Sequence, residues 1–120
     1  MSATSDSTPR LPPEAWRRLP FSRAAVGRQL SLSEGLLIGA AETGVPALRW
    51  YAADEPAVVL GNGQSPTILD LAACAEHGMR AFRRISGGTA VVVDAGLLSL
   101  DVALPAAHPL NASDVVQAYQ

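Results

Sequence analysis

Two strand-forming segments that flank a glycine loop constrain the fold of this chain more than any other feature. Residues 79–85 and 89–93 are rich in apolar side chains, and Ser86-Gly87-Gly88 joins them. Asp94-Ala95-Gly96 follows the second segment and has the composition of a turn. We therefore predict two strands joined by a short loop whose backbone can approach a ligand closely.

The segment after that turn, residues 97–104, shows the period of two that is expected of a strand. Such alternation is typical of a strand that buries one of its two faces. We expect the buried face to carry Leu98, Leu100, Val102 and Leu104.

The chain before the loop predicts a helix and two further strands. Ser31 and Glu34 have the spacing of a capping box, so we expect a helix over residues 31–43. Gly44 follows at a position where helices commonly end in a left-handed residue. Segments 47–52 and 57–61 are predicted to form an antiparallel pair around a short turn.

Further segments complete the expected organisation. Ser65-Pro66 can begin a second helix that ends near His77 and Gly78. Residues 114–120 predict a last helix of about two turns, which is marginal unless something packs on it. Residues 1–13 are rich in Ser, Thr and Pro and are expected to form a disordered leader before a folded region at 14–120.

Composition excludes several classes of partner. The 120 residues are 48% hydrophobic and 17% charged, which favours one folded core, and the net charge is −2. This balance gives no electrostatic reason to expect nucleic-acid or membrane partners. The chain has one cysteine, no secretory signal and no apolar run near the roughly 20 residues that span a bilayer, so we expect a cytoplasmic protein.

The paired arginines before the loop have the chemistry of an anion site. Arginine keeps its charge and donates two parallel hydrogen bonds to a carboxylate or phosphate. Arg83 and Arg84 are adjacent on a predicted strand, so only one of them can face a given pocket. Gly87 and Gly88 can turn their N–H groups toward phosphate oxygens. The Gly-Lys spacing of a P-loop and the Gly-x-Gly-x-x-Gly of a dinucleotide site are both absent.

The run from Arg83 to Asp94 resembles the Arg-Arg-x-Ser-Gly-Gly-Gly-Ala-Val-x-His-Asp signature of the biotin/lipoate A/B protein ligase family. Upstream, Leu48-Arg49-Trp50-Tyr51 and the run from Pro56 to Gln64 are similar to that family's first strands and its Gly-x-x-Gln turn. The likeness covers residues 30 to 120 in order. It implies the N-terminal part of a lipoate-protein ligase A-like catalytic domain, of the α/β (α+β) class, with a mixed, mostly antiparallel sheet flanked by helices and incomplete at its C-terminus.

The resemblance also implies an activity. Such an enzyme joins lipoate, or octanoate, to ATP with Mg²⁺ and passes the acyl group to a lysine of a lipoyl domain. The acceptors implied are lipoyl domains of 2-oxoacid dehydrogenase complexes or the glycine cleavage H protein. The residues carried over to the substrate and nucleotide site are Arg83, Arg84, Ser86, Gly87, Gly88, Thr89, Ala90, Asp94, Gly61 and Gln64. Arg84 would contact the activated carboxyl or phosphate, and the turn from Gly61 to Gln64 would border the acyl pocket.

Several positions depart from the family pattern. Thr89 replaces a third glycine, Val93 replaces a histidine, Leu97 replaces a common asparagine, and Asn62 stands where a basic residue is frequent. All nine basic residues are arginine, so the lysine that such ligases use downstream of the loop is absent. We therefore expect no catalytic residue within this chain and no competence of the chain alone.

Three interpretations follow. The first is a part of a lipoate ligase whose remainder carries the lysine. The second is an octanoyl or lipoyl transferase relative that uses a cysteine and no ATP. The third is a non-catalytic partner or pseudoenzyme that binds an acyl ligand or another subunit. Cys74 lies upstream of the loop and is expected to be a small core residue rather than that nucleophile. The spacing of His77 and His108 predicts no metal site.

Overall fold

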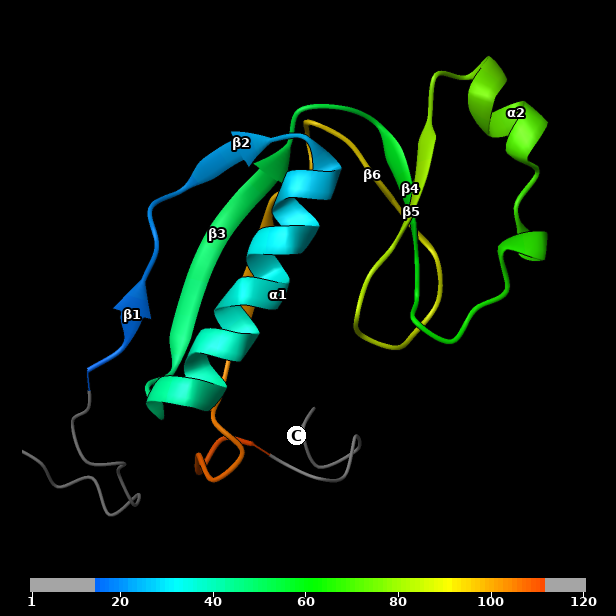
Figure 1. The fold of residues 1–120 in the computed structure, drawn as a ribbon. Coiled ribbons are helices and arrows are strands. Elements are labelled where there is room, and N and C mark those ends of the chain that lie inside the picture. The colour runs from blue at the N-terminus through cyan, green and yellow to red at the C-terminus, as the bar shows by residue number, and fades with distance from the viewer. Residues whose placement is uncertain (1–14, 112–120) are drawn as a thin grey trace, which may run out of the picture.

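The computed structural model describes residues 15–111, which form two sheets and two α-helices (Figure 1). The predicted leader at 1–13 and the predicted helix at 114–120 lie outside the described residues. The elements in chain order are β1 (Arg17–Arg18), β2 (Ser22–Ala24), α1 (Val26–Thr43), β3 (Ala47–Ala53), β4 (Ala57–Leu60), the 3₁₀ turn η1 (Pro66–Ile68), α2 (Leu71–Glu76), β5 (Arg80–Arg83), β6 (Val91–Val93) and β7 (Ser99–Ala103).

The strands form two mixed sheets rather than one. In sheet A, β1 and β2 pair parallel with one side of β3 and β7 pairs antiparallel with its other side. In sheet B, β4 lies between β5, which is parallel, and β6, which is antiparallel. The mixed α+β class is therefore confirmed, but most of the described pairings are parallel rather than antiparallel.

The predicted antiparallel pairing of the strands on either side of residues 54–56 is wrong. β3 and β4 belong to different sheets, because the short connection carries the chain from sheet A across to sheet B (Figure 1). β6 and β7 repeat this crossing, since β6 pairs with β4 and β7 pairs with β3. Two crossings therefore hold the sheets side by side.

Helix α1 begins five residues before the predicted capping box. Its N-cap is Ala25, which has no capping side chain, and the N–H of Val26 instead donates to Glu55 Oε1 at 3.1 Å. Glu55 follows β3 and comes from far along the chain, so the sequence around the helix start gives no sign of it. The predicted end is confirmed, because Gly44 has φ 71° and its N–H donates to Ala40 O.

The second predicted helix is broken into two pieces. Ser65 caps η1 by accepting from the Thr67 N–H, but Leu69 is extended and Asp70 then caps α2 by accepting from the Ala73 N–H. The aspartate competes with continuation of the first turn, as short polar side chains commonly do. No helix within residues 15–111 has the length and hydropathy needed to cross a bilayer.

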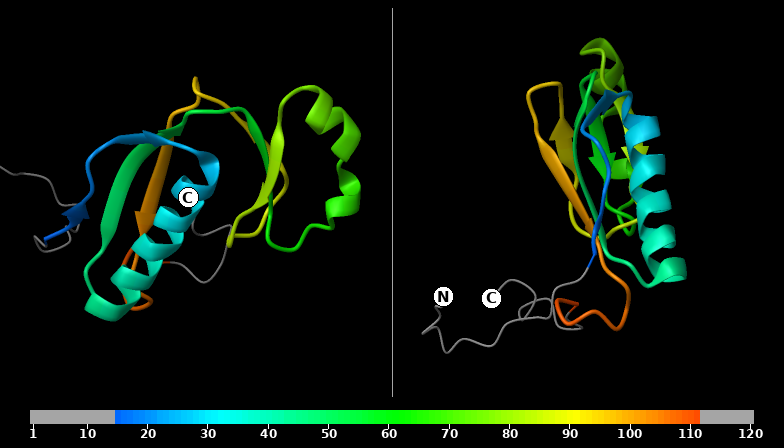
Figure 2. Two further views of the ribbon diagram at one scale, coloured as in Figure 1. Left: turned by 45° about the horizontal axis from the view of Figure 1, so that its top comes forward. Right: turned by 90° about the vertical axis from the view of Figure 1, so that its left-hand side faces the viewer.

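Small side chains make close contact between α1 and the sheets. One apolar cluster joins Leu36 and Ala40 of α1 to Ala47 and Ala103 of sheet A. A second joins Val26 to Ala53, Ala57 and Val59 where the chain passes to sheet B. The side views in Figure 2 show α1 lying along one face of sheet A. Helix α1 thus fixes the position of the connection between β3 and β4, where the chain passes from sheet A to sheet B.

The strand predicted at 97–104 is confirmed as β7, but its buried face is the opposite of the predicted one. Leu98, Leu100 and Val102 are 59%, 45% and 50% exposed. Asp101 and Ala103 face α1 instead, and Ala103 is buried. The reason is polar: Asp101 pairs with buried Arg49 and accepts a hydrogen bond from Ser33 of α1. Trp50, opposite Leu100 on β3, extends the exposed apolar face.

Replacing Glu55 should weaken the start of α1 in a pH-dependent way. The hydrogen bond from Arg80, and then the Val26 N–H, hold the pKa of Glu55 below its ordinary value of 4.5. A lowered folded-state pKa contributes stability above the unfolded-state value and loses it as pH falls. Glu55→Gln should therefore unfold at lower urea than the wild type near neutral pH, and the gap should narrow below about pH 4.5.

Circular dichroism during urea titration at neutral and acidic pH measures this gap. Glu34→Gln is the matched control, because Glu34 lies on the same helix and has no ion pair among the described residues. An equal gap for Glu55→Gln at both pH values would contradict the assignment.

Candidate functional site

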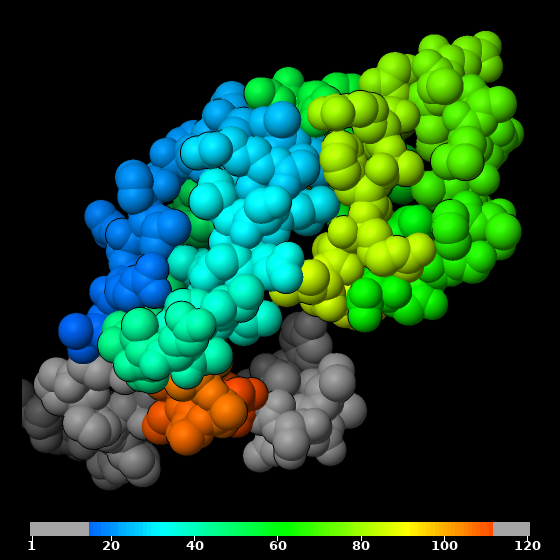
Figure 3. Space-filling view, viewed as in Figure 1, coloured from blue at the N-terminus to red at the C-terminus, as the bar shows by residue number. Residues whose placement is uncertain are grey.

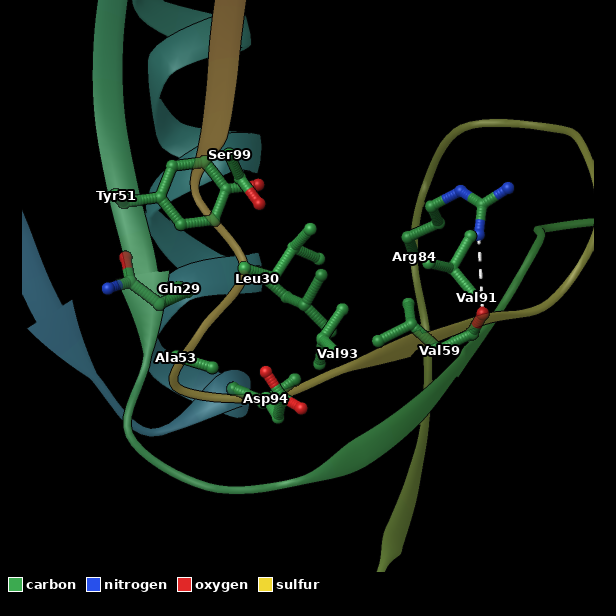
Figure 4. A pocket seen from close by; sticks show the side chains of 12 residues that line it. Gln29, Leu30, Tyr51, Ala53, Val59, Arg84, Val91, Val93, Asp94 and Ser99 are labelled. Atoms are coloured by element: carbon green, nitrogen blue, oxygen red, sulfur yellow. Dashed lines mark hydrogen bonds between the residues drawn. The ribbon is translucent and has the colours of Figure 1, made fainter.

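A cavity of about 200 Å³ lies where α1 faces both sheets (Figure 4). Its volume is below the roughly 300–1,000 Å³ of sites that hold drug-sized ligands, so it suits a short chain better than a nucleotide. The lining residues are Val26, Gln29 and Leu30 of α1, Tyr51, Ala53 and Ser99 of sheet A, Val59, Val91 and Val93 of sheet B, and Arg84, Asp94 and Leu97.

The two ends of the cavity differ in chemistry from its middle. Figure 4 shows Tyr51, Gln29 and Ser99 at the sheet A end and Arg84 at the sheet B end, with aliphatic side chains such as Leu30 and Val93 between them. An apolar passage with a cation at one end is complementary to a carboxylic acid with an aliphatic tail.

Arg84 is a cation that meets only neutral acceptors. Its Nε donates to Ser86 Oγ at 3.1 Å, Nη1 to Val59 O at 3.3 Å, and Nη2 to the carbonyls of Gly87 and Thr89 at 2.8 and 3.0 Å. No carboxylate within residues 15–111 forms an ion pair with it. A fixed, uncompensated positive charge beside an apolar cavity favours an anionic ligand.

Arg83 points to the other side, as the strand geometry predicts. Its Nη1 donates to the carbonyls of Gly61, Asn62 and Gln64 at 3.2, 2.9 and 2.6 Å. Arg83 is not part of the cavity lining. The structure therefore separates the paired arginines into one that faces the cavity and one that holds the turn after β4.

The loop at residues 86–88 wraps around the Arg84 guanidinium. Gly88 has φ 106°, a conformation that favours glycine, and a Cβ there would press on Arg84 Nη2. Within the described residues, the N–H groups of Gly87, Gly88 and Thr89 donate no hydrogen bond. These exposed donors beside a cation have the chemistry of a phosphate site. Ala90 connects this loop to β6.

Gly61 and Gln64 lie behind this loop and are not brought to the cavity. The Gln64 side chain accepts from the Gly61 N–H at 2.9 Å, and the Gln64 N–H donates back to Gly61 O. The Asn62 N–H donates to Ser86 O at 2.9 Å, which joins turn and loop. Gly61 approaches Gly88 so closely that any Cβ at residue 61 would overlap the Gly88 carbonyl. The turn at residues 61–64 therefore fixes the position of the loop at residues 86–88 without lining the cavity.

Asp94 combines the predicted turn role with a place in the cavity wall. Its Oδ1 accepts from the Gly96 N–H at 2.8 Å, which stabilises the turn between β6 and β7. Val93 and Leu97, two of the positions that depart from the family pattern, also line the cavity. Both substitutions make its wall more apolar.

Sequence reasoning missed the sheet A end of the cavity. Gln29 and Tyr51 were not singled out as site residues, although alternation along 47–53 places Arg49 and Tyr51 on one face of β3. Burial, and then the nearby Asp101 carboxylate, raise the pKa of Tyr51, so the hydroxyl stays protonated well above neutral pH. Its hydroxyl donates to Asp101 Oδ1 at 3.3 Å.

Other candidates lie away from the cavity. Cys74 is a free, partly buried thiol in α2, which lies beyond sheet B in Figure 1. The prediction of a core position for Cys74 is wrong, because α2 has no buried residue. Among residues 15–111 no three His, Cys, Asp or Glu side chains gather in a way that could hold a metal ion.

Comparison with known proteins identifies the family. The model of the lipoyl protein ligase A/B catalytic domain matches residues 27–120. This chain belongs to that family. Octanoyltransferase LipM of Moorella thermoacetica is 31% identical over 111 residues, which cover 91% of this chain and 40% of that protein.

Solved structures of lipoate ligases share the fold. A lipoate protein ligase of Thermoplasma acidophilum with bound lipoic acid superposes with a TM-score of 0.66 at 28% identity, over 74% of this chain and 37% of that one. A lipoate-protein ligase A bound with ATP gives 0.65 at 28% identity, over 74% and 36%. This family member therefore spans about two-fifths or less of the length of these relatives.

Gly61→Ala should displace the loop, because the new methyl group meets backbone rather than a mobile side chain. Overpacking of this kind typically costs about 1–3 kcal/mol, so we expect the free energy of unfolding in urea to fall by that amount. Gly63→Ala is the matched control, since a Cβ at residue 63 meets open space. Equal unfolding midpoints for the two variants would contradict the close approach of turn and loop.

Proposed function

We propose that this family member provides the acyl-binding part of an enzyme that activates lipoate or octanoate with ATP and transfers it to a lysine of a lipoyl domain. The observation that carries the proposal is Arg84, a cation without a carboxylate partner among the described residues, at one end of an apolar cavity. The relatives solved with lipoic acid and with ATP support this choice of substrates.

In this proposal the acyl chain lies between α1 and the two sheets, and its carboxylate lies at the Arg84 end. The aliphatic lining excludes water from the chain, and Leu97 and Val93 extend that lining. The carboxylate would replace some of the carbonyls that Arg84 now contacts. A charged partner is favoured there, because hydrogen bonds between ions are stronger than those to neutral carbonyls.

The nucleotide would lie outside the cavity, over the loop. The N–H groups of Gly87, Gly88 and Thr89 would donate to phosphate oxygens, and magnesium would arrive with ATP. In the adenylation step a carboxylate oxygen attacks the α-phosphorus of ATP. The bond between the α-phosphorus and the bridging oxygen of pyrophosphate breaks, and pyrophosphate leaves with the electron pair. Fixed donors where negative charge develops lower the barrier to such a step. The lysine acceptor belongs to lipoyl domains or to the H protein.

A second candidate is transfer of an octanoyl group without ATP. The similarity to octanoyltransferase LipM favours it. Such a transferase forms a thioester with a cysteine, and Cys74 in α2 is not among the cavity lining residues. The nucleophile would have to come from another part of the protein. The same cavity would hold the acyl chain in either reaction. For either activity, we propose that the protein is located in the cytoplasm.

Arg84→Ala should weaken binding of octanoate and lipoate by this chain. A hydrogen bond to a charged group contributes about 1.5–3 kcal/mol, which corresponds to roughly 10- to 150-fold in the dissociation constant. Arg84→Lys should have an intermediate effect, because lysine keeps the charge but loses the planar fork. Isothermal titration calorimetry measures these constants. Arg28→Ala, an exposed position on α1, is the control.

Activity assays on the complete protein distinguish the ATP-dependent ligase reaction from octanoyl transfer without ATP. A ligase should exchange pyrophosphate with ATP only when lipoate or octanoate is present, and Arg84→Ala should abolish most of that exchange. Octanoyl transfer from a thioester donor without ATP would favour the transferase. Unchanged octanoate binding by Arg84→Ala would sink both assignments.

We further propose that the remainder of the catalytic domain covers the exposed apolar face of sheet A, and that residues 14–120 are the N-terminal part of that domain. The exposed side chains are Trp50, Leu98, Leu100 and Val102, and β7 has a partner strand on only one side among the described residues. Faces of this kind commonly mark interfaces. Each of these relatives is more than twice as long as the part that matches this chain, so a remainder of similar length would be long enough to cover this face.

The double variant Leu100→Thr/Val102→Thr tests this cover. In the 120-residue chain it should reduce self-association in sedimentation velocity and change the free energy of unfolding by no more than about 0.5 kcal/mol per site, as exposed substitutions do. In a protein that includes the remainder it should be destabilising by about 2 kcal/mol or more. Val92→Thr, exposed on sheet B, is the control. Equal small effects in both proteins would contradict the cover.

A further inference from the structure

Arg49 is the most deeply buried charged side chain among the described residues. Its side chain is 1% exposed and lies between α1 and sheet A. Nε donates to Asp101 Oδ2 at 3.0 Å and Nη1 donates to Gln29 Oε1 at 2.6 Å. Nη2 donates to Gln29 O and to Ser33 Oγ at 2.7 and 2.9 Å. These contacts use every nitrogen of the guanidinium, so the group has a single orientation.

That orientation places a flat cation against the Tyr51 ring. The guanidinium carbon lies 3.9 Å from the ring centroid, and Arg49 and Tyr51 share one face of β3. Asp101, the carboxylate that pairs with Arg49, also accepts from the Tyr51 hydroxyl. The ring is therefore held on its face by Arg49 and at its tip by Asp101. Neither Arg49 nor Asp101 lines the cavity, whereas Tyr51 and Gln29 do.

We infer that Arg49 is a positioning residue that holds Tyr51 as the end wall of the cavity and thereby limits the length of acyl chain that can bind. The inference rests on the proposed function, since it gives the cavity a carboxylate end at Arg84 and a chain end at Tyr51. Figure 4 shows these two residues at opposite ends of the lining. A wall held by a buried cation stays in place because moving it would leave charged and polar groups without partners.

Arginine suits this role for two reasons. Its planar fork reaches Asp101, Gln29 and Ser33 at once, and its flat face stacks on the ring. Lysine could keep the charge beside Asp101 but has no flat face and only three donors at one point. Arg49→Lys therefore removes the stacking while it keeps the ion pair.

The first measurement needs no ligand and so stands apart from the proposed function. The chain contains two tyrosines, so Tyr119→Phe leaves Tyr51 as the only site for nitration by tetranitromethane. In that background Arg49→Lys should raise the nitration rate of Tyr51 roughly tenfold, the order expected for loss of a desolvated cation–π contact. Arg28→Lys on the exposed face of α1 is the matched control and should leave the rate unchanged.

The second measurement compares affinities for hexanoate, octanoate, decanoate and dodecanoate by calorimetry. The wild type should bind octanoate best, and Arg49→Lys should shift the optimum to longer acids. Tyr51→Ala, which removes the wall, should shift it at least as far. Tyr51→Phe keeps the stacked ring and loses only the bond to Asp101, so it should keep the wild-type optimum.

The outcomes separate the two proposals. A normal nitration rate in folded Arg49→Lys, or a Tyr51→Phe optimum shifted as far as that of Arg49→Lys, would overturn the positioning role. If Arg49→Lys does not fold by circular dichroism, Gln29→Ala removes the acceptor of Arg49 Nη1, and a nitration rate equal to wild type would then overturn it. Absence of any fatty acid binding would sink the proposed function, while the nitration result would still decide the role of Arg49.

Discussion

The buried guanidinium of Arg49 is the interaction on which the arrangement of α1 and sheet A depends. A charge with 1% exposure is tolerated only when it is paired and fully hydrogen-bonded, and removal of one partner from such a pair typically costs about 3–5 kcal/mol. Asp101 and Ser33 must therefore face Arg49. This requirement explains why β7 directs its polar side inward and leaves Leu100 and Val102 exposed.

Sheet B is organised by a different constraint, the contact of two glycines. Gly61 at the end of β4 approaches Gly88 of the loop, and Arg83 and Gln64 hold the turn that makes the approach possible. The loop then encloses the Arg84 guanidinium. In the space-filling view the segment around β5 lies beside α1 (Figure 3), in agreement with the packing of Phe82 against the apolar cluster that contains Val26 of α1. The cavity is the space left between these two separately fixed walls.

The sequence predicted what depends on local pattern and missed what depends on distant partners. Strand β7 and the opposite directions of Arg83 and Arg84 follow from alternation, and Gly44 follows from the cost of a left-handed residue. Strands β1 and β2 were not predicted. The start of α1 could not be predicted, because its capping group is Glu55. The prediction of the buried face of β7 was wrong, because alternation shows only which residues share a face. It does not show which of the two faces carries the side chain that pairs with a buried ion. Tyr51 was missed because the cavity exists only after both sheets are in place.

The positions that depart from the family pattern gain a physical meaning from the cavity. Val93 and Leu97 replace polar side chains and lie in its wall, so they increase the apolar area offered to an acyl chain. Asn62 and Thr89 do not line the cavity: the Asn62 N–H donates to Ser86 O, and Thr89 O accepts from Arg84. In the proposed reaction, the absent lysine would have supplied positive charge beside the phosphate. Under the proposed function, the described residues would enclose the chain and bind its carboxylate at Arg84, whereas stabilisation of the reacting phosphate would need positive charge beyond Arg84. On that proposal, acyl recognition and activation would be separable steps, and residues 15–111 would carry more of the first than of the second.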